Sequence, residues 1–363
     1  MSVRGSKTGA KALRSASSWR VVAVCVSITY VTTIAAAQSA PAESAGAVVE
    51  RPAAFSFAVL GDVVGGGGSD RGTRTALRAI DESPARFIVH FDLSPPSNAS
   101  CGEVAVRGRR DILDAMSKPV VPVVAASEWA ACVSRAIDPD ERLARVGDTL
   151  FGSDESLGQS KLRLARQSSV PRFQRYRENF RWQVGNVLFV VLNLPDNDNN
   201  YRFGAGRNGE FEERLVANRA WLERSFRFAA ERRLAGLVIF VDAAPRFGLP
   251  MRRPDLRSRV RDGYYEWKAT LRDLASSFTG QVLLVQGHVA AHAPSSNQPD
   301  HPLRDAGGRM LTHFTRIAVP DVSGGAAWLR IEIEPGRPKL FRIVTERVFD
   351  DPSGELYGPA RVR

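Results

Sequence analysis

Short apolar segments alternate with amphipathic stretches along residues 53–348. Six of the segments are four to six residues long, rich in β-branched or aromatic side chains, and bounded by Gly, Pro, Asp or Asn, as is typical of buried strands. They are Phe55–Leu60, Phe87–His90, Val120–Val124, Val187–Leu192, Leu237–Val241 and Val282–Val285. Two later strands, Trp328–Ile333 and Leu340–Val344, flank a proline-containing turn and are expected to pair as a hairpin.

Helical periodicity appears between the strands. In residues 210–233 apolar side chains recur every three or four positions on an otherwise charged segment, and Trp267, Leu271 and Leu274 follow the same spacing. Strands that alternate with helices predict a layered α/β fold. No internal segment is rich enough in Pro, Gly or Ser to divide it, so we expect one domain over 53–348.

The ends of the chain and two loops differ from this pattern in composition. We expect a flexible leader at 38–52, a C-terminal tail at 349–363, and long surface loops at 194–209 and 293–308. Long loops at strand ends are common places for binding and catalytic residues.

The first 37 residues have the three-part pattern of a secretory signal peptide. Basic residues without any acid precede an apolar run over 21–37, which ends in three alanines before Gln38. The run is shorter than a membrane span requires and contains Ser and Thr, so cleavage after Ala37 is favoured over an uncleaved anchor helix. We therefore expect an exported protein, periplasmic or secreted, that does not contact the membrane after cleavage.

The number of cysteines and the net charge add little to the predicted fold and export. Outside the signal the chain has Cys101 and Cys132, which an oxidising compartment can join in a disulfide, although two unpaired thiols remain the alternative. The net charge of +11 overstates the basic excess, because five of the 50 basic residues lie in the signal, leaving 45 against 39 acids. These charges are spread along the chain, so we expect no nucleic-acid partner.

Polar residues follow the predicted strands. Asp62, Asp92, Ser127, Asn193, Asp242 and His288 each come at or just after a strand end. Ligands of open α/β sheets bind beyond the carboxyl ends of strands, and converging carboxylates and imidazoles suit a divalent metal ion. The alternative is that these residues cap helices and stabilise loops.

Several of these blocks together resemble the calcineurin-like metallophosphoesterases. The blocks are FSFAVLGD (55–62), FIVHFDLSPPSNASC (87–101), VVPVVAASEW (120–129), NVLFVVLNLPDNDNN (186–200), GLVIFVDAAP (236–245) and QVLLVQGH (281–288). The segments SLGQ (156–159), RYRENFRW (175–182), NRAWLERSF (218–226) and HFTRI (313–317) are similar to those of exported bacterial members. The likeness covers about 55–343.

The resemblance implies a four-layer β-sandwich flanked by helices, and phosphoester hydrolysis by a hydroxide bound to two divalent metal ions. It assigns metal binding to Asp62, Asp92, Ser127, Asp242 and His288. Several positions depart from the family pattern: Val64 and Ala290 stand where histidines are expected, Phe91 replaces a glycine, and Ala125 and Ala126 replace a Gly-Asp pair. Asp242 takes the place of another histidine.

Two functions follow from this donor set. The first is a metal-dependent phosphoester hydrolase with an eroded dinuclear site, which would bind one or two ions of Mn, Fe or Zn and act on a phosphorylated small molecule. The second is a catalytically inactive periplasmic binding or interaction module that retains the scaffold. The sequence does not decide between an enzyme and a pseudoenzyme, and it identifies no catalytic residue besides the metal ligands.

Overall fold

The structure is a computed structural model. It describes residues 53–61, 70–91, 103–125, 139–202, 208–245, 247, 262–287, 303–319 and 326–348. Among the helices of these residues, none combines the length and hydropathy that crossing a bilayer demands.

The first sheet combines three parallel strands with a C-terminal hairpin. Its strand order is β11-β10-β1-β2-β3. The strands are β1 (Phe55–Gly61), β2 (Ala85–Phe91), β3 (Val120–Val123), β10 (Ala326–Ile333) and β11 (Phe341–Val348). β1 pairs in parallel with β2 and antiparallel with β10, so the end of the chain completes the sheet that its beginning starts.

The second sheet has the order β4-β5-β6-β7-β8-β9. Its strands are β4 (Ala165–Arg166), β5 (Phe180–Val184), β6 (Val187–Val191), β7 (Gly236–Val241), β8 (Gln281–Gln286) and β9 (Phe314–Ala318). The last four strands run parallel, whereas β5 pairs antiparallel with β6.

Aromatic rings from both sheets form the centre of the core. Phe57 of β1 lies edge-on to Phe189 of β6 at 5.3 Å, and Trp182 of β5 stacks on Phe189 at 5.2 Å. Phe57 and Phe189 are fully buried, and removing such a side chain from water stabilises a fold by roughly 1.5–3 kcal/mol. These contacts hold the two sheets face to face as a sandwich.

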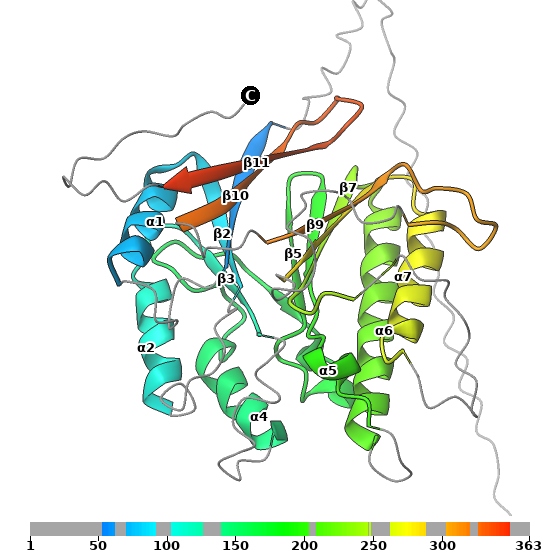
Figure 1. Ribbon diagram of the computed structural model, residues 1–363, viewed down its shortest axis with the longest axis horizontal. Coiled ribbons are helices and arrows are strands. Elements are labelled where there is room, and N and C mark those ends of the chain that lie inside the picture. The colour runs from blue at the N-terminus through cyan, green and yellow to red at the C-terminus, as the bar shows by residue number, and fades with distance from the viewer. Residues whose placement is uncertain are drawn as a thin grey trace, which may run out of the picture. The chain divides into compact units, whose positions relative to one another are not determined.

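Helices cover the outer faces of both sheets (Figure 1). Apolar residues of α1 (Asp70–Glu82) and α2 (Glu103–Asp114) pack on the first sheet. α6 (Gly209–Glu231) and α7 (Tyr265–Ser277) cover the second. Two further helices, α4 (Pro139–Leu150) and the single-turn α5 (Asp196–Asn199), follow β3 and β6 in the chain.

The structure therefore confirms the predicted four-layer α/β sandwich. All six predicted inner strands, the closing hairpin and the helices around 210–233 and 267–274 are present. Three strands were not predicted. β4 has only two residues, and β5 and β9 each carry an arginine that interrupts the apolar pattern.

Candidate functional site

The carboxyl ends of parallel strands from both sheets lie at one end of the sandwich. Within the first sheet, Gly61 of β1 pairs with Phe91 of β2, which pairs with Val123 of β3. Between the sheets, the ring of Phe91 lies 6.3 Å from the ring of Phe240, the penultimate residue of β7. Since Phe91 is the last residue of β2, the chain leaves β2 and β7 at the same end.

Most residues of the predicted metal site lie outside the described part of the chain. These are Asp62, Asp92, Ser127 and His288, together with the predicted disulfide partners Cys101 and Cys132. The described residues that immediately precede Asp62, Asp92 and His288 are Gly61, Phe91 and Gly287.

Asp242 is the one predicted metal ligand that the structure describes. It follows the last residue of β7 and is only 8% exposed. A Cβ atom at Gly287 would lie 2.0 Å from the Asp242 carbonyl oxygen and 2.6 Å from its Oδ1, so residue 287 must be glycine for the chain to pass Asp242. The Gly287 N–H donates to the Val241 carbonyl at 3.0 Å. The residue that precedes His288 in the sequence is therefore in contact with Asp242.

Asp242 belongs to a row of four residues across the end of the second sheet. Continuing the observed pairing by two residues places Glu178 opposite Asn193 and Asn193 beside Asp242. The pairing of Val241 with Gln286 continues the row to Gly287. The core between the sheets receives one side chain near this end of each strand: Phe180, Val191, Phe240 and Val285. Successive residues of a strand alternate between its faces, so the residues two positions nearer this end lie on the same face. We call Glu178, Asn193, Asp242 and Gly287 the end row.

Glu178 is the residue of the end row that the sequence did not single out. It is 2% exposed, and the Asn193 side-chain amide donates to its Oε1 at 3.4 Å. Burial raises the pKa of Glu178 to about 7, although the bond from Asn193 and the positive charge of Arg214 both lower it. Near neutral pH the end row therefore contains a carboxyl group that gains or loses a proton readily.

A network of buried side-chain amides fixes the position of Asn193 in the end row. Asn179 Oδ1 accepts a bond from the Asn193 backbone N–H at 2.8 Å, and Asn218 of α6 donates to the Asn193 carbonyl at 2.9 Å. Asn179 in turn donates to Asn218 and to Gln167, both at 2.8 Å. The segments RYRENFRW and NRAWLERSF thus meet through Asn179 and Asn218, which gives a structural reason for those two asparagines.

The segment 195–200 after β6 is fixed by a buried arginine. Asp198, Asn199 and Asn200 have φ angles of 57°, 60° and 55°, in the left-handed region that Asp and Asn tolerate best. Arg214 is fully buried and donates to both the side chain and the carbonyl of Asn199, and its Nε bonds Glu210 at 2.6 Å. Asn199 is itself fully buried, so it neither lines a cleft nor lies in a solvated turn.

Two of the histidines have structural surroundings. His90 points away from the end row, is 2% exposed, and lines a cavity of about 20 Å³ with Arg109 and Leu113 of α2. Burial, assisted by the charge of Arg109, lowers the pKa of His90 to about 4. His313 Nε2 bonds the Ala275 carbonyl at 2.8 Å. Both histidines therefore contact the packed interior of the fold and not the end row.

The donor types at this end of the sandwich suit a divalent cation. Asp242 supplies a buried carboxylate, and in the described part of the chain Asn193 Oδ1 is buried without a hydrogen-bond partner. The described residues contain no group of three or more Asp, Glu, His or Cys side chains arranged to bind a metal. A complete site would therefore need Asp62, Asp92 or His288 in addition.

The similarity of this chain to known proteins lies in its fold. No family model and no curated protein matches the sequence. The fold is similar to the crystal structure of the calcineurin-like phosphoesterase YfkN from Bacillus subtilis, with a TM-score of 0.39 and 9% sequence identity. The similarity covers 85% of this chain and 93% of that one.

Proposed function

We propose that this protein is a metal-dependent phosphoester hydrolase that keeps part of a dinuclear metal site. One observation carries the proposal: strand ends of both sheets meet where the sequence continues into acidic or imidazole residues. Phe91 contacts Phe240, and the chain continues from them to Asp92 and Asp242. Asp242 in turn packs against Gly287, the residue before His288.

In this proposal Asp62, Asp92, Asp242 and His288 hold a divalent ion of Mn, Fe or Zn, with Ser127 as a weak oxygen donor. Four such ligands suffice for one ion completed by water and are few for two. When bound, the ion activates water and neutralises charge on the phosphoryl oxygens.

The chain's own residues orient this centre. Packing against Gly287 restricts the Asp242 carboxylate. The backbone of Asn193 beside it is fixed by the bond that its N–H donates to Asn179 and the bond that its carbonyl accepts from Asn218. The protein would thus present preorganised oxygen atoms to the substrate and its counter-ion. We propose that it does so after export to the periplasm or the medium, as its first 37 residues predict.

The test measures bound metal and hydrolysis together. The chain without residues 1–37 is supplied with Mn, Fe or Zn, its metal content is determined, and an aryl phosphate monoester and diester are assayed. Asp92→Asn and Asp242→Asn should each lower metal content and abolish hydrolysis. Asp111→Asn, which changes an exposed carboxylate of α2, is the matched control and should change neither.

Failure of this test has a definite meaning. Metal below about 0.1 per chain at saturating supply, with no hydrolysis, would overturn the enzyme proposal and favour the binding or interaction module. Hydrolysis that persists in Asp92→Asn and Asp242→Asn would instead overturn the assignment of these residues.

A further inference from the structure

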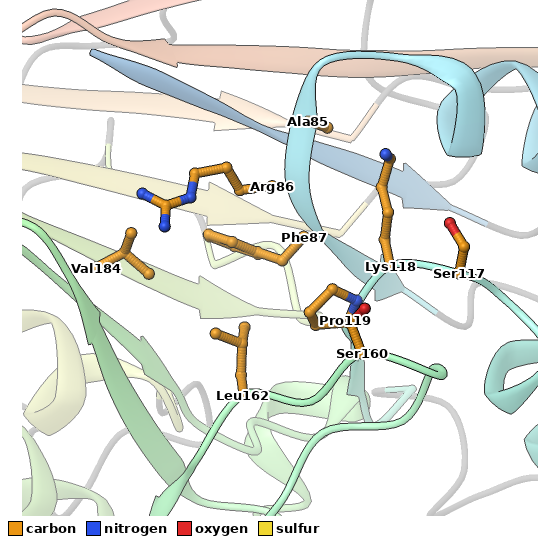
Figure 2. Close-up of a pocket in the computed structure, with 9 residues that line it drawn as sticks. All are labelled: Ala85, Arg86, Phe87, Ser117, Lys118, Pro119, Ser160, Leu162 and Val184. Carbon is orange, nitrogen blue, oxygen red and sulfur yellow. The ribbon is translucent and has the colours of Figure 1, made fainter. Parts of the chain in front are cut away.

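A second pocket opens at the end of the sandwich opposite the end row. It has a volume of about 440 Å³ and is bounded by the start of β2, the turn before β3, the loop before β4 and the end of β5. Its lining residues are Ala85, Arg86, Phe87, Ser117, Lys118, Pro119, Ser160, Leu162 and Val184 (Figure 2). A pocket of this volume is large enough to hold a small molecule, and polar and apolar residues both line it.

The charged groups of this pocket are all positive. Arg86 and Lys118 line it, and no acidic residue does. Within the described residues neither cation forms an ion pair; Arg86 instead lies 5.5 Å from the centre of the Phe55 ring. The nearby carboxylate of Asp81 accepts hydrogen bonds from the hydroxyl and the backbone N–H of Ser117. An anion in the pocket would therefore meet two cations, while the carboxylate of Asp81 is bonded to Ser117 and does not line the pocket.

Apolar side chains form the floor between these cations. In Figure 2, Phe87, Pro119 and Leu162 are grouped between Arg86 on one side and Lys118 on the other. Phe87 and Pro119 are buried, whereas Arg86 is exposed. A ligand that fits both features has an apolar body for the floor and an acid group within reach of the flexible basic side chains.

The wall that carries Ser160 and Leu162 is rigid before any ligand arrives. Gly158 has a φ of 91°, and a Cβ there would lie 2.0 Å from the Lys118 carbonyl oxygen. Asp114 accepts bonds from the Gly158 N–H at 3.0 Å and from Lys161 at 2.9 Å. Little ordering of this wall would oppose binding.

We propose that this pocket binds an organic anion with an aromatic or branched aliphatic body, at a site separate from the end row. Arg86 binds the acid group by paired hydrogen bonds, Lys118 adds a second positive charge, and the floor of Phe87, Pro119 and Leu162 receives the apolar body. This site does not depend on metal or on hydrolysis.

The test uses 8-anilinonaphthalene-1-sulfonate as the probe, titrated by fluorescence and calorimetry in the presence of a metal chelator. The unsubstituted protein should bind one equivalent, more weakly as salt is added. Arg86→Gln and Lys118→Gln should each raise the dissociation constant about fivefold or more. Arg347→Gln, which changes an exposed arginine of β11 outside the pocket, should leave it unchanged.

A neutral probe completes the design. N-phenyl-1-naphthylamine has the same apolar body without the sulfonate. It should bind the unsubstituted protein more weakly than the sulfonate probe does, and Arg86→Gln should leave its own dissociation constant unchanged. Equal affinity of both probes, or unchanged sulfonate binding in both pocket variants, would overturn the proposal. Ser160→Trp fills the pocket from its exposed loop. It should abolish sulfonate binding and leave the thermal unfolding midpoint unchanged. Unchanged sulfonate binding in this variant would show that the probe binds elsewhere and would also overturn the proposal.

Discussion

The two ends of the sandwich differ in how far their polar groups are buried. At the end row, Glu178, Asn193 and Asp242 are almost fully buried and bonded or packed against neighbouring backbone. At the other end, Arg86 is exposed, and it and Lys118 flank an open pocket. Buried polar groups contribute strongly to stability and to pH dependence, whereas exposed charges contribute little to either and respond to salt.

The largest expected effect lies at the buried end, at Arg214. Arg214→Met removes the partner of Asn199 and of the Glu210 carboxylate from a fully buried position. We expect the free energy of unfolding to fall by about 4 kcal/mol. Urea unfolding followed by circular dichroism measures it.

Arg219→Met is the matched control on the same helix. Arg219 is exposed and pairs with Glu223 at 2.9 Å, so its loss should cost no more than about 0.5 kcal/mol. Similar losses in the two variants would show that burial does not distinguish these arginines.

The next effect is a pH dependence from Glu178. The native state keeps the Glu178 proton until its pKa of about 7, whereas the unfolded chain releases it near the ordinary value of 4.5. Glu178 therefore lowers stability progressively as pH rises from 4.5 to 7, by about 3 kcal/mol in total, and the loss then stays constant. Glu178→Gln should remove this slope.

Comparing the unsubstituted protein with Glu178→Gln separates the pH dependence due to Glu178 from that due to His90. The lowered pKa of His90 acts in the opposite direction, because its stabilising contribution is lost as pH falls from 6.5 to 4. This contribution is common to both proteins and cancels in their difference, measured by urea unfolding at pH 5 and pH 8 with a chelator present. Glu212→Gln, at an exposed position of α6, should follow the unsubstituted protein. A difference that does not change with pH would mean that Glu178 titrates normally.

The smallest effect belongs to the exposed end. Arg86→Gln should lower the free energy of unfolding by only about 0.5 kcal/mol, since it removes one exposed contact with the Phe55 ring. Thermal unfolding at low and high salt checks this value. A loss of several kcal/mol would place Arg86 among the groups that hold the fold and would remove the contrast between the ends.

The sequence predicted the strands of the core because they are continuous apolar runs. It missed β5 because Arg181 interrupts the run, yet this side chain is buried and its guanidinium lies 4.4 Å from the Phe228 ring centre and 5.1 Å from that of Trp221. The stem of an arginine can pack against aromatic rings, which a count of apolar residues does not register.

The candidate site was predictable only in part. Strand ends indicated Asn193 and Asp242, since a polar residue after a buried strand is visible in the sequence. Glu178 was not indicated, because it lies among the arginines of RYRENFRW, where a carboxylate suggests surface ion pairs. Only the antiparallel pairing of β5 with β6 brings it opposite Asn193.

The three successive left-handed residues after β6 have a consequence for sequence variation. A β-branched side chain at 198, 199 or 200 would be strained by roughly 1–2 kcal/mol per position, so backbone shape alone restricts this triplet to Asp, Asn or Gly. Such a restriction would persist in a descendant that had lost all chemistry. In a library of variants selected only for folding, we expect the triplet to be retained.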